Sequence, residues 1–338
     1  MIQSDIDLQP FNTMTIAARA KHFCAVTSLE ELREALTFAR EKSLPILPLG
    51  GGSNIVLTDD FPGLVLHLGM RGLEFEEDSA GVRIRAAAGE NWHQLVMRSV
   101  EAGFGGLENL ALIPGNIGAA PIQNIGAYGV ELKDYFERLT AVEIASGDLV
   151  TFTADDCAFG YRDSVFKGAG KDRYLICEVV LRLPNTWKPH VDYPALQQFF
   201  AKEGRALDQL TPAAIADAVI EIRNSKLPNP VEIPNTGSFF KNPVVSEAQY
   251  TALKESHPDV VAYAAGEGWK LAAGWLIDHA GWRGFQRDGV GVHDRQALVL
   301  VNPGHCSGQQ VVGLAREIAA DIKDKFGVTL EPEPRFYP

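Results

Sequence analysis

The sequence predicts a globular protein that mixes helices and strands, of the α/β or α+β class, with two or three domains. Its 338 residues exceed the roughly 250 to 300 that a single hydrophobic core usually serves. Apolar residues make up 46% and charged residues 22%, as in ordinary globular proteins without long disordered segments. Strand patterns alternate with helix patterns, and glycine-rich loops follow strands in two places.

The chain opens with a predicted β-α-β unit. A strand at 22–27 leads into a helix at 29–39 with an apolar face. Ser28 and Glu31 have the spacing of a capping box at the start of this helix. The apolar run at 45–49 is short enough for a buried strand.

A second unit of the same kind follows. Strands are expected at 64–68 and 82–87, and a helix at 91–102 ends at Gly103. Residues 139–153 predict a hairpin that turns at Ser146, Gly147 and Asp148. A further strand is expected at 174–183.

The C-terminal half is less regular. Residues 184–204 form an aromatic stretch interrupted by prolines, and Thr211 can cap a helix that begins at Pro212. Three prolines within 227–234 predict a domain boundary. The elements expected beyond it are two helices and a terminal strand, at 269–279, 309–326 and 328–338.

Charge and composition exclude several classes of function. The formal net charge of −12 argues against non-specific binding to nucleic acid or anionic lipid. The four cysteines lack C-x-x-C spacing and the eight histidines form no H-x-x-x-H pair, so neither a metal site nor a disulfide framework is expected. No signal-peptide pattern or apolar membrane span is present in the sequence. We therefore expect a cytoplasmic monomer with reduced cysteines, without a metal, nucleic-acid or membrane partner.

The most unusual segment is IPGNIGAAPIQNIGAYG, residues 113–129, which we call the uncharged segment. It has four glycines, two prolines and no charged side chain. Glycines let the backbone approach a ligand, and the amides of Gln123 and Asn124 can pair with the edge of a heteroaromatic ring. A bound flavin or similar ring explains this pattern, although a buried glycine-rich turn between strands explains the segment alone equally well.

A second glycine-rich motif, GGGSN, follows the apolar run at 45–49. The amides of Gly50, Gly51 and Gly52 can converge on a phosphate, and the Ser53 hydroxyl, next to Asn54, can add a donor. No lysine follows the glycines and the spacing is not G-x-G-x-x-G. The motif therefore favours a dinucleotide pyrophosphate, without a nucleoside triphosphate loop or the usual Rossmann fingerprint.

Two polar clusters add candidate chemistry. NTGSFFKNP at 235–243 places the Ser238 hydroxyl near Lys241 and Asn242, which suits an anionic substrate as well as a simple turn. FGYRDSVFK at 159–167 offers the planar guanidinium of Arg162 to a carboxylate, although a surface ion pair is the common alternative.

Six motifs occur in one chain in a fixed order. They are GGGSN, IPGNIGAAPIQNIGAYG, YRDSVFK, GSFFKNP, KLAAGWLID and LEPEPRF. Together they resemble the UDP-N-acetylenolpyruvoylglucosamine reductase family, flavoenzymes of peptidoglycan precursor synthesis, over essentially the whole length. The resemblance implies an α+β fold, with FAD held by two α/β subdomains of the vanillyl-alcohol-oxidase-like type and a third domain that helps to bind a UDP-sugar. The boundaries expected are 1–70 with 328–338 packed back on it, 71–227, and 228–327.

The resemblance also implies the chemistry and the residues. NADPH delivers hydride to non-covalent FAD and leaves, and UDP-N-acetylglucosamine enolpyruvate then accepts the hydride in a ping-pong reaction. Ser238 matches the proton donor of the family, and Arg162 and Glu333 match its other two catalytic positions. Pro334 directly follows Glu333, so the backbone there has no amide donor. The cofactor contacts implied are Gly50, Gly51, Gly52, Ser53, Asn54, Pro114, Gly115, Gly118, Ala119, Gln123, Asn124, Gly126, Ala127 and Tyr128.

Substrate contacts are implied at Arg223, Lys226 and Asn242, and at Tyr193, which resembles the substrate-covering tyrosine of one subclass. The main alternative is an FAD-dependent sugar or alcohol oxidase of the same flavin-binding fold, in which a histidine often tethers the flavin where this chain has Ser53. A binding protein for nucleotide-sugars is the alternative outside enzymes.

Overall fold

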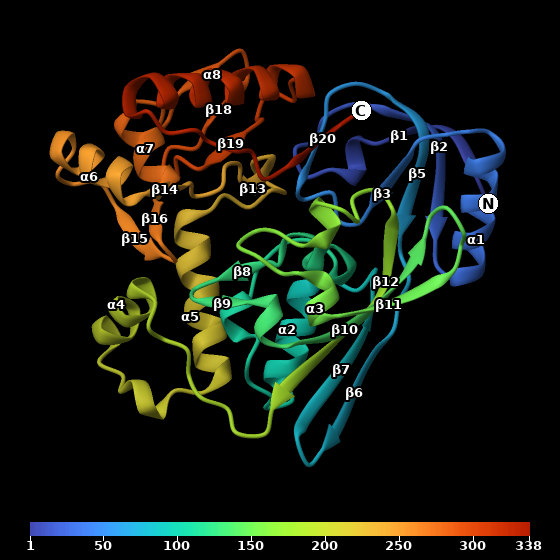
Figure 1. The fold of residues 1–338 in the computed structure, drawn as a ribbon, viewed down its shortest axis with the longest axis horizontal. Coiled ribbons are helices and arrows are strands. Elements are labelled where there is room, and N and C mark those ends of the chain that lie inside the picture. Colours follow the sequence, from blue (N-terminus) through green and yellow to red (C-terminus); the bar gives the residue numbers. More distant parts are fainter. The chain divides into compact units, whose positions relative to one another are not determined.

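The computed structural model describes residues 1–338, apart from the side chain of Asp208. The chain forms two compact units, and each consists of separate stretches of sequence (Figure 1). The first unit contains residues 1–4, 22–51 and 63–225, and the second contains residues 5–21, 52–62 and 226–338. The division into three domains with the boundaries expected above stays a prediction.

One sheet has the strand order β1-β2-β5-β3. Its strands are β1 (Gln3–Asp7), β2 (Arg19–Val26), β3 (Ile46–Leu49) and β5 (Phe61–Leu68). Between β2 and β3 lies helix α1 (Leu29–Glu41), whose start is capped by Ser28 Oγ, an acceptor for the Glu31 amide at 3.1 Å. The Glu31 carboxylate accepts from the amide and hydroxyl of Thr27, both at 2.7 Å. The predicted cap at Ser28 is confirmed. The Glu31 carboxylate accepts from Thr27, one residue before the Ser28 amide that a capping box would use.

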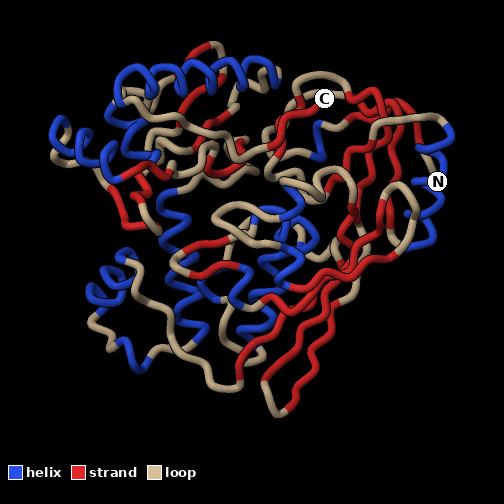
Figure 2. The backbone as a smooth tube through the Cα atoms, in the orientation of Figure 1, coloured by secondary structure: helices blue, strands red, loops and turns tan.

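A five-stranded antiparallel sheet forms the largest layer of the first unit (Figure 2). Its order is β11-β10-β12-β7-β6, with β6 (Leu73–Asp78), β7 (Gly81–Ala87), β10 (Phe136–Glu143), β11 (Leu149–Thr153) and β12 (Tyr174–Pro184). Helix α2 (Trp92–Glu101) buries Trp92, Leu95 and Val96 in one core with Val82 and Ile84 of β7. The predicted hairpin and strands are confirmed.

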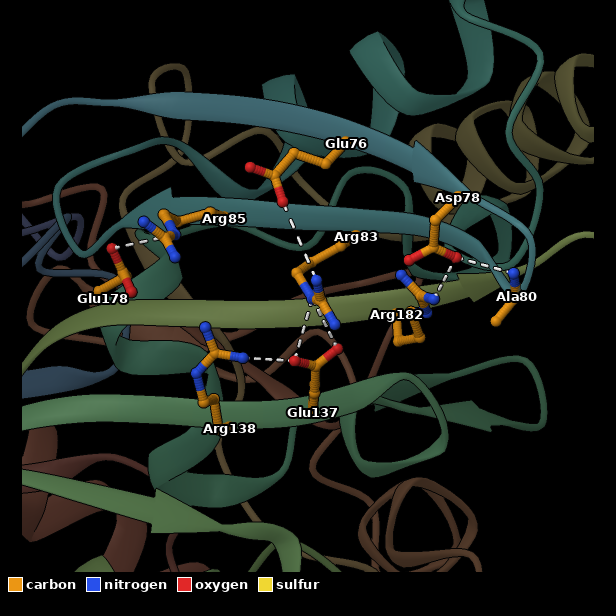
Figure 3. Close-up of polar contacts among 9 residues, drawn as sticks. All are labelled: Glu76, Asp78, Ala80, Arg83, Arg85, Glu137, Arg138, Glu178 and Arg182. Atoms are coloured by element: carbon orange, nitrogen blue, oxygen red, sulfur yellow. Dashed lines mark hydrogen bonds and ion pairs between the residues drawn. The ribbon is translucent and has the colours of Figure 1, made fainter.

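The other face of this sheet carries alternating charges (Figure 3). Arg83 of β7 pairs with Glu137 of β10 at 3.0 Å, and Arg85 pairs with Glu178 of β12 at 3.7 Å. On β7 these arginines alternate with buried apolar residues, as the period of two in a strand requires. Arg85 pairs with the adjacent strand β12, and Arg83 reaches across β12 to Glu137 of β10, so cross-strand pairs hold this face together.

The rest of the first unit consists of short elements and two helices. These are η2 (Glu108–Leu110), η3 (Ile117–Gln123), β8 (Gly126–Ala127), β9 (Val130–Glu131), η4 (Leu132–Asp134), α3 (Ala154–Cys157), η5 (Val165–Lys167), α4 (Pro194–Glu203), η6 (Leu207–Gln209) and α5 (Pro212–Lys226). Thr211 Oγ1 accepts the Ala214 amide at 3.2 Å, which confirms the predicted start of α5. Helix α4 was not expected, because prolines surround it, but Pro194 lies at its first position, where no amide donor is needed.

The second unit is built on three small sheets and three α-helices. Its elements are η1 (Gln9–Phe11), β4 (Ile55–Leu57), β13 (Asn235–Ser238), β14 (Val244–Ser246), α6 (Glu247–Ser256), β15 (Ala262–Ala265), β16 (Gly268–Leu271), α7 (Ala273–His279), β17 (Gln286–Arg287), β18 (Val290–Val292), β19 (Val299–Val301), α8 (Gly308–Phe326) and β20 (Arg335–Tyr337). The sheet orders are β13-β19-β18-β17 and β14-β16-β15, and β20 pairs in parallel with β4.

Two sequence predictions for this unit are wrong in part. Trp269 was placed in a helix, but it lies in β16, where it pairs with β14 and β15 and stacks on Tyr250 with centroids 4.1 Å apart. Strand pairing with distant residues overrides the helical pattern there. The terminal strand covers only Arg335–Tyr337, and the residues before it are not in a strand. Helix α8 ends at Gly327 as predicted, with φ +68°.

The cysteines confirm the expectation of structural thiols. All four are free and buried. Burial raises the pKa of Cys157 to about 12 and that of Cys177 to about 11. Such thiols stay protonated and unreactive near neutral pH.

Candidate active site

The glycine-rich loop after β3 packs closely against other backbone. In the first unit, a Cβ on Gly51 would lie 3.2 Å from Gly115 Cα, so the loop and the uncharged segment are in contact. In the second unit, Gly52 has φ +62° and a Cβ there would lie 2.0 Å from the Phe11 carbonyl oxygen. A side chain at position 52 is therefore excluded by both its conformation and its surroundings.

Backbone donors of this loop fit an anion. Among the described residues, the amides of 51–53 donate to no acceptor. Unsatisfied amides on successive residues are the donor set of an anion nest, and they agree with the expected contact to a dinucleotide pyrophosphate. Asn54 differs, since its carbonyl accepts the Arg335 amide at 3.1 Å. The cofactor roles of Gly50, Gly51, Gly52, Ser53 and Asn54 stay predictions, and the donor pattern supports those of Gly51, Gly52 and Ser53.

The uncharged segment is fixed by backbone bonds to residues 88–92. The Ile117 amide donates to Glu90 at 2.9 Å, and the Gly118 amide donates to Ala88 at 3.0 Å. A Cβ on Gly118 would lie 2.6 Å from the Ala88 Cβ, so packing alone accounts for this glycine. Pro114 and Ala119 are exposed, while Gly115, Gln123, Gly126, Ala127 and Tyr128 are half-buried. These exposed and half-buried positions remain the predicted cofactor contacts.

Asn124 differs from the other predicted cofactor contacts because its side chain is fully buried. Its Nδ2 donates to Glu131 Oε2 at 2.9 Å and to the Gly160 carbonyl at 3.0 Å, and its Oδ1 accepts the Lys133 amide at 3.0 Å. The direct contact expected between this amide and a flavin stays a prediction. The structure shows that the amide group is already engaged within the protein.

Arg162 sits on a loop with unusual backbone geometry. Its φ is +53°, in the left-handed region that an arginine rarely adopts. Its Nη2 donates to the Gly126 carbonyl at 2.7 Å, and Lys167 Nζ donates to the Arg162 carbonyl at 3.1 Å. The guanidinium is thus held beside the uncharged segment.

Arg223, on α5 in the same unit, is a second arginine of this region. Its Nε is buried and has no hydrogen-bond partner among the described residues. Burial lowers the pKa of Arg223, and the positive charge of Arg162 lowers it further. Two arginines whose positive charges interact suit an anionic ligand. Arg162 and Arg223, both predicted from sequence, are brought together by the fold.

Tyr128 and His93 lie close enough to Arg223 for its charge to affect them. Burial raises the pKa of the Tyr128 hydroxyl, and Arg223 opposes that shift. The Tyr128 and Tyr193 rings meet edge to face with centroids 5.2 Å apart, and Tyr193 is 42% exposed. The site reasoning from sequence missed His93, whose Nδ1 accepts the Leu112 amide at 3.0 Å and whose pKa is lowered by burial and by Arg223.

In the second unit, Ser238 and Glu333 are joined through the backbone. Ser238 ends β13 opposite Val299, after Gly237 with φ +71°. The Glu333 amide donates to the carbonyl of Phe239, the residue after Ser238, at 2.8 Å. The next backbone hydrogen bond along the chain is the one that the Arg335 amide donates to the Asn54 carbonyl. Pro334 lies between these two donors, so its missing amide interrupts neither hydrogen bond.

The structure also shows a partner of Asn242 and the position of Lys226, two of the predicted substrate contacts. Asn242 Oδ1 accepts the Ala273 amide at 2.9 Å at the start of α7, which leaves its Nδ2 to other partners. Lys226 is exposed at the end of α5.

Comparison with known proteins identifies the family. The FAD binding domain model matches residues 20–153, and the model of the UDP-N-acetylenolpyruvoylglucosamine reductase C-terminal domain matches residues 229–337. UDP-N-acetylenolpyruvoylglucosamine reductase from Paraburkholderia phytofirmans is 50% identical over 329 residues, 97% of this chain and 95% of that protein. The chain belongs to the UDP-N-acetylenolpyruvoylglucosamine reductase family.

Other relatives give the same result. The reductase from Ralstonia nicotianae is 52% identical over 96% of this chain and 95% of its own length. The reductase from Pseudomonas syringae is 47% identical over 99% of this chain and 99% of its own length. The solved UDP-N-acetylenolpyruvylglucosamine reductase of Thermus caldophilus has a TM-score of 0.69 at 23% identity and covers both chains fully. The predicted α+β fold, with an FAD-binding part followed by a separate C-terminal domain, is confirmed.

Among the described residues, no group of three or more histidine, cysteine, aspartate or glutamate side chains could hold a metal ion. None of the helices that the structure describes is both long and apolar enough to span a membrane.

Proposed function

We propose that this reductase-family chain catalyses the NADPH-dependent reduction of UDP-N-acetylglucosamine enolpyruvate to UDP-N-acetylmuramate in peptidoglycan precursor synthesis. The observation that carries the proposal is that an FAD binding domain and the reductase C-terminal domain occur together in a chain 50% identical to a named reductase over 97% of its length. Both NADPH and the nucleotide-sugar are metabolites of the cytoplasm, so we further propose a cytoplasmic enzyme. We also propose that it works as a monomer.

FAD fits the residues present. The loop amides at 51–53 can hold its pyrophosphate, and the uncharged segment, with Gln123, would lie against its ring. When bound, FAD would accept hydride from NADPH and supply it to the enolpyruvyl group, which makes the reaction ping-pong. We propose that the protein binds FAD without a covalent link.

The arginines would recognise the substrate carboxylate. Negative charge grows on that carboxylate when hydride reaches the vinyl carbon, and planar guanidinium groups stabilise such charge through paired hydrogen bonds. Arg162 is held beside Gly126, and the Nε of Arg223 is buried without a partner among the described residues. These two observations support the assignment of the carboxylate to Arg162 and Arg223.

Ser238 would then donate the proton that completes the reduction. Ser238 is the last residue of β13, and the Glu333 amide donates to the carbonyl of the next residue, Phe239. Glu333 would assist polarisation of the substrate. Lys226, Asn242 and Tyr193 are proposed contacts of the nucleotide-sugar, with the exposed Tyr193 as its cover.

The test is an anaerobic absorption experiment on the purified protein. NADPH is added first, and UDP-N-acetylglucosamine enolpyruvate second, while the flavin band is followed. Bleaching by NADPH and recovery upon addition of the enolpyruvyl substrate are expected. A flavin that stays oxidised with NADPH, or bleaching without recovery, would overturn the proposal.

A further inference from the structure

The loop that carries Arg162 is held in a conformation that its own sequence does not favour. We call residues 160–167 the arginine loop. Arg162 has φ +53°, and the flanking residues Gly160 and Asp163 bond to each other through their backbone, Gly160 donating at 3.0 Å. Because an arginine rarely adopts this geometry, contacts from elsewhere must maintain it.

Asn124 supplies such a contact. Its side chain is fully buried, and it joins the end of the uncharged segment to the Gly160 carbonyl at 3.0 Å and to Glu131 at 2.9 Å. Its Oδ1 also receives the Lys133 amide. One amide group therefore links the uncharged segment to the backbone of Gly160 and Lys133 and to the Glu131 carboxylate.

Two more bonds run between the same partners. Ser164 Oγ donates to the Ile122 carbonyl at 2.7 Å, and Arg162 Nη2 donates to the Gly126 carbonyl at 2.7 Å. The residues they reach lie on either side of Asn124. The arginine loop is thus fastened to the uncharged segment on both sides of this asparagine.

We propose that Asn124 is a positioning residue, whose amide fixes the arginine loop against the uncharged segment so that Arg162 faces the substrate carboxylate. The inference rests on the proposed function, because it assigns the carboxylate to Arg162. It gives Asn124 an indirect part in the reaction, through the placement of a guanidinium. A displacement of about 1 Å in such a group can cost on the order of 100-fold in rate.

Asn124→Asp isolates the contribution of the Nδ2 donor. Asn124 has φ +44°, a geometry that aspartate tolerates nearly as well as asparagine. Aspartate keeps an acceptor for the Lys133 amide, loses both donor bonds and places a carboxylate opposite Glu131. Asn124→Gly removes both donor bonds and also the acceptor of the Lys133 amide, without burying a charge, and serves if the aspartate variant fails to fold.

Asn185→Asp is the matched control. The Asn185 side chain also donates to a backbone carbonyl, that of Ser79 in the β6–β7 turn, but Asn185 is exposed and directly follows β12. Asn185→Asp removes the same kind of hydrogen bond at a place away from the arginine loop.

The first readout needs neither cofactor nor substrate. Hydrogen exchange of the amides of 160–167 is measured in the protein without added ligand. Faster exchange in this loop is expected for Asn124→Asp and Asn124→Gly, and unchanged exchange for Asn185→Asp. Exchange in the arginine loop equal to that of the wild type would overturn the proposal.

The second readout separates the two half-reactions by stopped flow. Asn124→Asp is expected to slow flavin reoxidation by the enolpyruvyl substrate by about 10- to 100-fold, and to slow it more than it slows flavin reduction by NADPH. In an Arg162→Ala background the Asn124 substitution should have almost no further effect on reoxidation. Multiplicative effects in the double variant would show that Asn124 does not act through Arg162.

Failure of the proposed function gives a different pattern. A wild-type protein without substrate-dependent reoxidation overturns the reductase assignment. If the wild type shows substrate-dependent reoxidation, fast hydrogen exchange in the Asn124 variants combined with wild-type reoxidation rates in those variants overturns the positioning role alone.

Discussion

The two units hold their predicted catalytic residues in different ways. In the first unit, side chains fasten the Arg162 loop: Asn124 to Gly160, Ser164 to Ile122, and Lys167 to Arg162. In the second unit, strand pairing places Ser238 opposite Val299, and a backbone bond joins Glu333 to Phe239. Substitutions near Arg162 should therefore act at a distance, whereas near Ser238 the reacting side chain itself should dominate.

The largest effect is expected at Ser238. Ser238→Ala should slow flavin reoxidation by about 10²- to 10⁴-fold and leave reduction by NADPH nearly intact, because only the second half-reaction consumes the proton. Stopped-flow absorption measures both steps. The control is Ser256→Ala, which removes a hydroxyl that donates to Ala252 in α6 of the same unit. Equal slowing of both half-reactions would remove Ser238 from the role of proton donor.

Arg162→Lys should be the next largest. An ammonium cannot form the paired hydrogen bonds of a guanidinium, so reoxidation should fall by about 10- to 100-fold. The same substitution at Arg85, which pairs with Glu178 on the outer face of the sheet, should leave both half-reactions unchanged. Near-normal turnover of Arg162→Lys would show that the charge alone is enough, and it would weaken the contrast between the units.

Gly52→Ala tests the backbone of the glycine-rich loop. With φ +62° and a Cβ 2.0 Å from the Phe11 carbonyl oxygen, alanine should lower the free energy of unfolding by about 1–3 kcal/mol and weaken FAD binding. Urea unfolding and flavin fluorescence titration are the measurements. Gly313→Ala in α8 is the control, because a Cβ there meets nothing within 4 Å and should stabilise the helix by about 0.5–1 kcal/mol. Unchanged stability of Gly52→Ala would contradict the packing described here.

The smallest effect concerns pH. Burial, assisted by the charge of Arg223, lowers the pKa of His93 below its unfolded value of about 6.5. The unfolded chain therefore binds more protons, so stability is complete above pH of about 6.5 and falls as the pH drops toward the folded pKa. The urea midpoint should decrease over this range, and less so in His93→Gln. An identical pH dependence in both proteins would contradict this assignment.

Local signals in the sequence predicted much of the fold and failed where distant contacts decide. The cap at Ser28, the end of α2 at Gly103 and the start of α5 at Pro212 depend on neighbouring residues, and the structure confirms them. Trp269 was placed in a helix because its strand partners, β14 and β15, are supplied by tertiary pairing.

The predicted site shows the same limit. The six motifs identified the family, and the glycines and prolines marked the backbone that approaches other groups. His93 and Ser164 were missed, since a histidine in an amphipathic helix and a serine in a loop carry no local signal of their partners. Asn124 was noticed for its amide, but its partner Gly160 lies 36 residues away.

The sequence by itself determined the family, the cofactor class and the positions of glycine-rich loops, because these depend on residue identity and short spacing. Only the tertiary structure decided which side chains meet: Arg162 with Gly126, Arg223 with its aromatic neighbours, and Asn124 with the arginine loop. The physical reason is that hydrogen bonds and charge interactions act over a few ångströms. The fold alone brings residues far apart in the chain within that distance.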